Sequence, residues 1–347
     1  MTLKTVVELQ YVDVEGEGGF SHQDSGVNKV ATRSPQVGLD KAAFSLQFPI
    51  RPALDYAVEA KFTDSSAHID RHYFTFRLPS LNTKFELGKN RPFIKTDRRT
   101  EVYPLIGTAY WRNRQYHLVS ETQFELNSLN LTFNASLAQQ RHLGTREAAK
   151  DPSFKMLVYD DGPPKDGQTF EGGAGLSVQY RPLKLAAWGF RGTLIDDFDW
   201  KNQLSQSIQH YDDLGDKTDR THFWIGSRLD FDLASWHLRG EIIKSQDGLL
   251  PRHGYYWEAS YLLELPGTYL IHSIEPLFRS DTLKIGGVSP QLANPLTWDR
   301  AMKTLAIILG LDRHLALNIE YCLLEEETGS ALSVRDDQFL VRLKMEI

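Results

Sequence analysis

The sequence predicts an all-β fold in one domain spanning residues 1–347, an up-and-down antiparallel transmembrane β-barrel of about 16 strands. Three observations predict it. Apolar and polar residues alternate with a period of two over most of the chain, and no convincing helical periodicity accompanies them. The connections between the alternating segments are short and long in turn. No run of about 18 apolar residues occurs, so no transmembrane helix is expected.

The alternating segments define the expected strands. They are separated by stretches rich in Pro, Gly, Asn, Asp and Ser, which favour turns and end strands. In chain order the expected strands are 2–15, 37–48, 54–64, 68–78, 82–89, 115–126, 130–140, 172–181, 184–195, 221–231, 236–245, 254–265, 269–279, 299–311, 315–325 and 336–347.

The connections sort by length. Short, turn-like connections are 49–53, 79–82, 127–130, 181–183, 232–235, 265–268 and 311–314. Between them lie the long polar connections 16–36, 89–114, 141–171, 196–220, 280–298 and 326–335, and the intermediate 64–68 and 246–253 fall in the same series. An up-and-down membrane barrel has short turns at its periplasmic rim and long loops outside. An even number of strands also places both chain ends at the short-turn rim.

Most strands have one apolar face and one polar face. Strand 130–140 shows the pattern, with Leu131, Phe133, Ala135 and Leu137 on one parity. Such alternation also fits a soluble barrel or sandwich with its apolar face inside. About 16 strands, however, are too many to close around a side-chain-filled interior. No core helix is predicted that could cover the apolar parity, and aromatic residues gather near strand ends. The apolar parity is therefore expected to face lipid.

Two stretches of the chain resemble a known family. These are residues 68–104, HIDRHYFTFRLPSLNTKFELGKNRPFIKTDRRTEVYP, and residues 304–347, TLAIILGLDRHLALNIEYCLLEEETGSALSVRDDQFLVRLKMEI. Both look like segments of the phosphate-selective porin O/P family of Gram-negative bacteria. The resemblance implies a 16-stranded outer-membrane barrel, a homotrimer, and a third long loop that folds into the pore. The chain departs from the family by ending on Ile347, where members usually end on Phe, and by lacking a dense ladder of inward-facing arginines.

The loop at residues 89–114 is the candidate constriction loop. Its first part, KNRPFIKTDRRTE, carries five basic and two acidic residues, a net charge of +3 in a protein whose net charge is −6. Folded into a lumen, this charge would favour anions such as phosphate, because low-dielectric walls concentrate its field. The alternatives are a solvated external loop, or a loop paired with luminal acids. The candidate residues are Lys89, Arg91, Lys95, Arg98 and Arg99 of the loop, with Arg71, Arg77 and Lys84 on adjacent strands.

Charges on the expected inward parity are balanced in sign. Basic residues such as Arg228, Arg239, Arg342 and Lys344 oppose acids such as Glu8, Glu59, Glu121, Glu258 and Glu320. Balanced signs suggest a general or weakly selective pore whose wall is stiffened by cross-strand ion pairs.

The predicted function is a passive, water-filled channel for small hydrophilic or anionic solutes in the cell outer membrane. No catalytic residue, cofactor or metal is assigned, and the negative net charge gives no support for a nucleic-acid partner. Outer-membrane lipid or lipopolysaccharide is an expected partner. Met1 opens a strand-like segment rather than a signal peptide, so any signal was removed before this numbering.

Two other functions remain open. A structural or scaffolding barrel, for example the sheath of an electron conduit in a larger envelope complex, would show the same pattern. An outer-membrane barrel enzyme would need an acid–base group at the rim, for which His210 beside Asp212 and Asp213 is the candidate.

Overall fold

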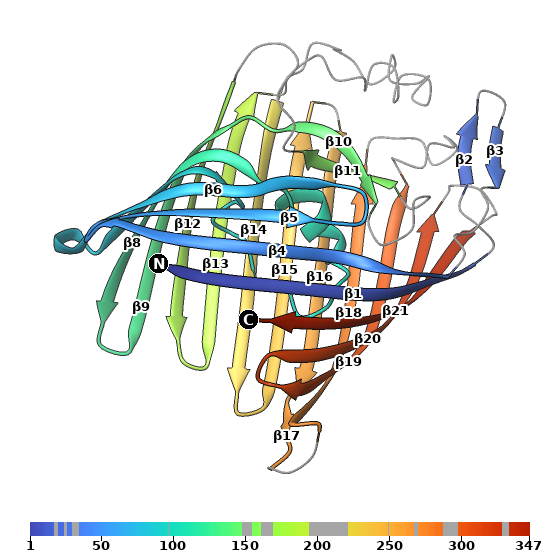
Figure 1. Ribbon diagram of the computed structural model, residues 1–347. Helices are drawn as coiled ribbons and strands as arrows, with labels where there is room; N and C mark the ends of the chain where they lie inside the picture. The colour runs from blue at the N-terminus through green and yellow to red at the C-terminus, as the bar shows by residue number, and fades with distance from the viewer. Residues whose placement is uncertain are drawn as a thin grey trace.

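Sixteen long strands close into one antiparallel barrel in the computed structural model (Figure 1). The structure describes residues 1–16, 20–23, 26–29, 35–96, 98–147, 155–160, 169–193, 221–248, 250–266, 270–286, 298–327 and 333–347. The barrel strands within them are β1 (Thr2–Gly16), β4 (Gln36–Arg51), β5 (Leu54–Phe62), β6 (Ala67–Leu78), β7 (Thr83–Asn90), β8 (Gln115–Leu126), β9 (Leu129–Gln139), β12 (Phe170–Tyr180), β13 (Leu183–Thr193), β14 (Thr221–Leu233), β15 (Trp236–Asp247), β16 (Leu250–Tyr261), β18 (Ser273–Ile285), β19 (Asp299–Asp312), β20 (Leu315–Glu327) and β21 (Ser333–Glu346).

The first and last strands close the barrel. β1 pairs with β21 from Val6 opposite Glu346 to Gly16 opposite Asp336, and it pairs with β4 on its other side. Each of the sixteen strands therefore has a hydrogen-bonded neighbour on both sides. Closure removes the open strand edges, which could not be satisfied inside hydrocarbon.

All sixteen predicted strands are present, in the predicted order. The boundaries differ most at two neighbouring strands: β16 covers 250–261 rather than 254–265, and β18 covers 273–285 rather than 269–279. Between them the short strand β17 (Leu263–Glu264) pairs with the first residues of β18 and lengthens the turn. The structure adds two hairpins inside long connections, β2 (Phe20–Gln23) with β3 (Gly26–Lys29) and β10 (His142–Glu147) with β11 (Lys155–Asp160). It also contains a 3-10 turn, η1 (Pro79–Leu81), and a π-helical turn, η2 (Gly107–Trp111).

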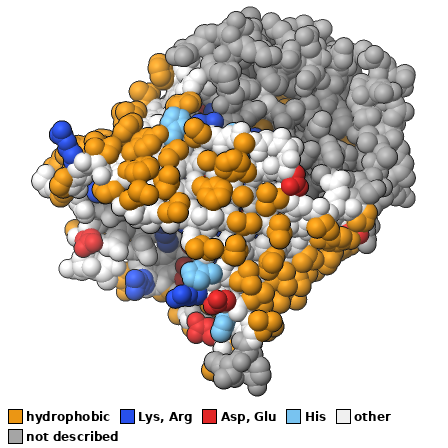
Figure 2. Space-filling view, in the orientation of Figure 1, with side chains coloured by type: hydrophobic (Ala, Val, Ile, Leu, Met, Phe, Trp, Pro, Cys, Tyr) orange, Lys and Arg blue, Asp and Glu red, His pale blue; other side chains and the backbone are white. Residues whose placement is uncertain are grey.

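The barrel is apolar outside and polar inside, as predicted. On β14, Ile225 and Leu229 are 50% and 40% exposed, whereas Arg228 on the other face is only 8% exposed. Figure 2 shows apolar side chains spread over the outer surface of the strands nearest the viewer. This arrangement inverts that of a soluble barrel and matches a barrel wetted by lipid.

No helix in the described part of the chain has the length and apolar character needed to cross a membrane.

The barrel also encloses an apolar core, which was not predicted. Residues 91–114 and hairpin β10–β11 lie inside the barrel and supply part of this core. Trp224 on the inner face of β14 stacks on Phe190 with ring centroids 4.3 Å apart, and Tyr110 of η2 stacks on Trp224 at 5.8 Å. A Cβ at Gly254 of β16 would lie 2.6 Å from the Ile106 side chain, so this close approach requires glycine.

The hairpin β10–β11 is fixed to the same part of the wall. Asp247 of β15 accepts a hydrogen bond of 3.0 Å from the Tyr159 hydroxyl, and Arg252 of β16 donates one of 3.1 Å to the Leu157 carbonyl. Asn113 donates one of 2.8 Å to the Tyr159 carbonyl and so joins the two inserted segments. Together they occupy the side of the lumen next to β12–β20.

A pair of neighbours on β9 tests the orientation of the barrel faces. Phe133 is 46% exposed on the outer face, and Asn134 faces the lumen opposite Glu121. Phe133→Arg should lower the free energy of unfolding by about 2–4 kcal/mol, because it places a cation in hydrocarbon. Asn134→Arg should change it little. Urea unfolding of the protein in lipid vesicles measures both. Equal effects of the two substitutions would contradict a lipid-facing Phe133.

Candidate functional site

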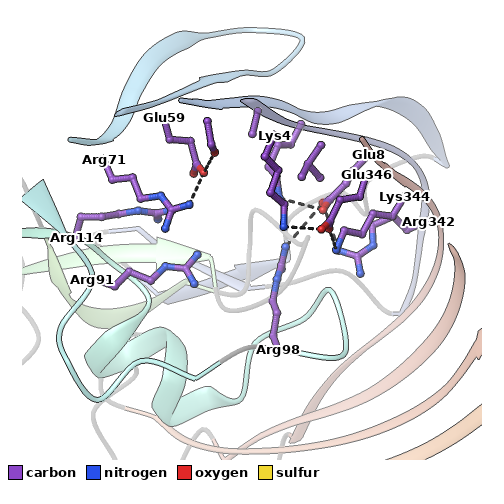
Figure 3. A pocket seen from close by; sticks show the side chains of 14 residues that line it. Lys4, Glu8, Glu59, Arg71, Arg91, Arg98, Arg114, Arg342, Lys344 and Glu346 are labelled. Atoms are coloured by element: carbon purple, nitrogen blue, oxygen red, sulfur yellow. Dashed lines mark hydrogen bonds and ion pairs between the residues drawn. The ribbon is translucent and has the colours of Figure 1, made fainter. Parts of the chain in front are cut away.

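A charged cavity of about 420 Å³ lies between residues 91–114 and the inner faces of β1, β4–β6 and β21 (Figure 3). Eight basic and three acidic side chains line it, an excess of five positive charges. The basic residues are Lys4, Lys41, Arg71, Arg91, Arg98, Arg114, Arg342 and Lys344, and the acidic residues are Glu8, Glu59 and Glu346. Lys4 and Glu346 lie close to the chain ends, so the cavity extends toward the short-turn rim.

Each acidic side chain of the cavity contacts more than one polar or basic side chain. Glu8 lies 3.0 Å from the Lys41 ammonium and 3.3 Å from the Arg342 guanidinium. Glu346 lies 2.5 Å from the Lys4 ammonium and 3.1 Å from that of Lys344. The carboxylates therefore fix the positions of the basic groups and offset only part of their charge. Glu101, outside the cavity lining, also forms ion pairs with Arg98 and Arg342.

Glu59 organises the other side of the cavity. It lies 2.7 Å from the Arg71 guanidinium and accepts a 2.5 Å hydrogen bond from Ser45. Figure 3 shows Arg71, Arg91 and Arg114 on this side, with their charged ends directed into the cavity. Arg114 forms an ion pair with Asp70. Within the described residues Arg91 has no carboxylate within 4 Å and donates instead to the Tyr103 hydroxyl at 2.9 Å.

Tyr103 lies among arginines. The guanidinium carbons of Arg98 and Arg112 are 4.7 and 4.9 Å from its ring centroid, and that of Arg91 is 5.8 Å away. Burial alone would raise the pKa of the Tyr103 phenol, but the field of Arg98, Arg91 and Arg112 lowers it to about 8. The depressed pKa is a measure of the positive potential beside the cavity.

Residues 91–114 are held against the opposite wall by buried charged groups. Glu241 of β15 accepts a 2.8 Å bond from the Trp111 indole and a 2.7 Å bond from Arg228 of β14. Arg228 also donates to the Ile94 carbonyl at 2.7 Å. These wall charges are satisfied by the loop, so they are not available to a solute.

A second set of contacts holds the middle of the loop. Glu320 of β20 accepts a 2.5 Å bond from the backbone N–H of Glu101. Arg279 of β18 donates to the Thr100 hydroxyl at 2.6 Å and to the Val102 carbonyl at 3.0 Å. The loop thus follows the wall from β14 to β20 and leaves the cavity on the side of β1, β4–β6 and β21.

The predicted basic residues separate into several groups. Arg71, Arg91 and Arg98 line the cavity. Arg99 points to the opposite wall, where it forms an ion pair with Glu275 and a 2.5 Å hydrogen bond with Ser260.

Three others lie outside the cavity lining. Lys95 is exposed on the loop. Arg77 of β6 forms an ion pair of 2.6 Å with Asp55 of β5. Lys84 of β7 lies 3.4 Å from the carboxylates of Glu86 and Glu121, which also lie on strands.

The assignment of Lys89 to the lumen was wrong. Lys89 lies on β7 opposite His72 and Tyr116, and it shares the parity of the exposed Leu87. Its side chain therefore belongs to the outer face. Because β7 continues to Asn90, alternation rather than the loop decides where Lys89 points.

Five basic residues of the cavity were not among the candidates. Lys4 and Lys41 come from β1 and β4, Arg342 and Lys344 from β21, and Arg114 from the end of the loop. The inward parity of Arg342 and Lys344 was visible in the sequence. Their proximity to Lys4 and Lys41 follows only from closure of β1 on β21.

Other candidate chemistry finds little support in the described residues. His210, Asp212 and Asp213 lie outside them. The carboxylates of Glu8, Asp40 and Glu101 approach one another within 4.8 Å, a spacing that could hold a metal ion. Lys41, Arg98 and Arg342 already surround these acids, so the group fits ion pairing better than a cation site.

A scan against protein-family models and a search of curated proteins found no match. Solved structures do match over the whole chain. The outer membrane channel DcaP of Acinetobacter baumannii aligns with a TM-score of 0.66 and 10% identity, covering 100% of this chain and 96% of that one. The anion-selective porin from Comamonas acidovorans aligns with a TM-score of 0.61 and 11% identity, covering 100% and 99%.

A third structure, OmpT of Vibrio cholerae in its trimer form, aligns with a TM-score of 0.58 and 8% identity, covering 100% of this chain and 98% of that one. At these identities the comparisons establish the fold: the chain is a 16-stranded β-barrel of the kind formed by outer-membrane porins.

Proposed function

We propose that the protein is an outer-membrane porin, a passive water-filled channel that favours small anions. The observation that carries the proposal is the cavity inside the barrel, which is lined by five more basic than acidic side chains. The cavity lies inside a barrel whose outer face is apolar, which supports a position within the membrane. The solved anion-selective porin with the same fold supports the proposal.

In the proposed mechanism, residues 91–114 form the constriction. Their bonds to β14–β20 hold the loop in one place, and it narrows the lumen to the passage beside β1, β4–β6 and β21. Arg91 and Arg98 of the loop then face Arg71 and Arg342 of the wall. Low-dielectric walls strengthen the field of these groups and raise the local concentration of anions.

Passage also requires that anions leave. Glu8, Glu59 and Glu346 are interspersed among the basic groups and limit the depth of any single binding site. Weak, repeated sites permit conduction, whereas one deep site would trap the solute. Phosphate is a candidate solute, since guanidinium groups bind it through two parallel hydrogen bonds. We also propose a homotrimer, in keeping with the trimer form of the similar Vibrio cholerae protein.

Reversal potentials across a planar lipid bilayer test the channel and its charge preference. In a KCl gradient the protein should conduct in discrete steps and favour Cl⁻ over K⁺. Combined Lys41→Gln, Arg91→Gln and Lys344→Gln should reduce that preference, because three of the eight basic groups of the cavity are removed.

Lys89→Gln is the matched control, since it removes a positive charge from the outer face and should leave the reversal potential unchanged. K⁺ preference in the unmodified protein would refute the proposed anion selectivity. The absence of conductance steps would refute the channel and favour a scaffolding barrel.

The anion preference should also depend on pH through Tyr103. Its phenol is neutral below its pKa of about 8 and negative above it, so raising the pH removes one net positive charge from the cluster. The ratio of Cl⁻ to K⁺ permeability should fall between pH 7 and pH 9. In Tyr103→Phe it should stay constant over this range. The same fall in both proteins would show that another group is responsible.

A further inference from the structure

Three basic side chains form a row on the outside of the barrel. Lys244 of β15 lies directly opposite His253 of β16, and His253 lies directly opposite Lys284 of β18. All three are exposed, and they share the parity of the exposed Ile242 and Tyr255. Their side chains therefore project from the outer face, away from the cavity.

The row lies at the long-loop edge of the apolar surface. At the short-turn end of the same strands, Trp236 and Tyr261 face each other with ring centroids 5.0 Å apart. Lys244 follows Trp236 by eight residues, about 27 Å along a strand. The lipid-facing band of such barrels is about 25 Å tall. With the strands tilted by about 40°, that length corresponds to about 20 Å along the membrane normal. The row therefore lies near the upper edge of the apolar band, and the long lysine side chains can extend from there to the headgroups of the outer leaflet.

The row lacks internal charge compensation. Among the described residues no carboxylate lies within 4 Å of Lys244, His253 or Lys284. Asp299 of the next strand, β19, is hydrogen-bonded to the backbone instead: it accepts a 2.8 Å bond from the N–H of Ile285. The two lysine charges therefore flank His253 with no carboxylate between them.

We propose that Lys244, His253 and Lys284 bind the phosphate groups of a phosphorylated lipid of the outer leaflet. Three adjacent strands span about 10 Å, enough for a headgroup to contact all three residues. Below them, Ile242, Tyr255 and Trp257, which are 55%, 48% and 47% exposed, provide an apolar surface for the acyl chains. Charge and apolar surface thus match the two parts of one lipid molecule. This site is separate from the channel and does not depend on its selectivity.

Lipid retention by the detergent-purified protein, measured by native mass spectrometry, tests the site. The probe is diphosphoryl lipid A. Combined Lys244→Gln, His253→Gln and Lys284→Gln should weaken its binding roughly 30-fold, counting the two lysines alone. Lys244→Arg with Lys284→Arg should retain binding, which keeps the test informative if the glutamine variant folds poorly.

The matched control is the triple variant Arg181→Gln, His272→Gln and Arg313→Gln. It removes the same number of exposed basic residues at the short-turn rim and should bind the probe like the unmodified protein. Equal binding by the row variant and the control would overturn the proposal. Equal binding of a dephosphorylated lipid A would show that acyl chains alone suffice. Displacement of the probe by millimolar inorganic phosphate would show a free-anion site instead of a lipid site.

Discussion

The interior of this barrel depends on one constraint: charged side chains buried on the inner wall of β14–β20 must be compensated. Removing one partner of a buried ion pair costs about 3–5 kcal/mol. Residues 91–114 supply the missing partners through the Trp111 indole and the backbone groups of Ile94, Glu101 and Val102. The same bonds fix the loop on one side of the lumen. The charged cavity on the other side, and the basic groups that line it, follow from that placement.

Most of the fold could be predicted from the sequence because its determinants are local. Alternation over about ten residues and turn-forming residues at fixed places identify each strand. The internal core could not be predicted in this way. Trp188, Phe190 and Trp224 face inward beside outward apolar residues such as Ile225, so both parities are apolar there. Their partners, Tyr110 and Tyr159, are distant in sequence and meet them only in the closed barrel.

The candidate site was predicted only in part, because some of its residues come together only when the barrel closes. Arg91 and Arg98 stand out as a basic cluster in a loop, and Arg71 lies on an inward parity. Lys89 belongs to the same cluster by sequence, but it precedes the end of β7 and alternation turns it outward. Lys4 and Lys344 lie at opposite ends of the chain, and nothing local shows that they share one carboxylate, Glu346. Closure of the barrel creates that part of the cavity.

The central claim is that the lumen is open beside β4 and closed beside β15, and cysteine labelling tests it most directly. Ser45 lines the cavity, whereas Ser245 is fully buried beneath Tyr110. The native Cys322 is also fully buried and should give no background. A water-soluble anionic thiol reagent should modify Ser45→Cys rapidly and lower the conductance, and it should leave Ser245→Cys unmodified until the protein unfolds. Equal rates at both positions, or faster reaction at Ser245→Cys, would contradict the account.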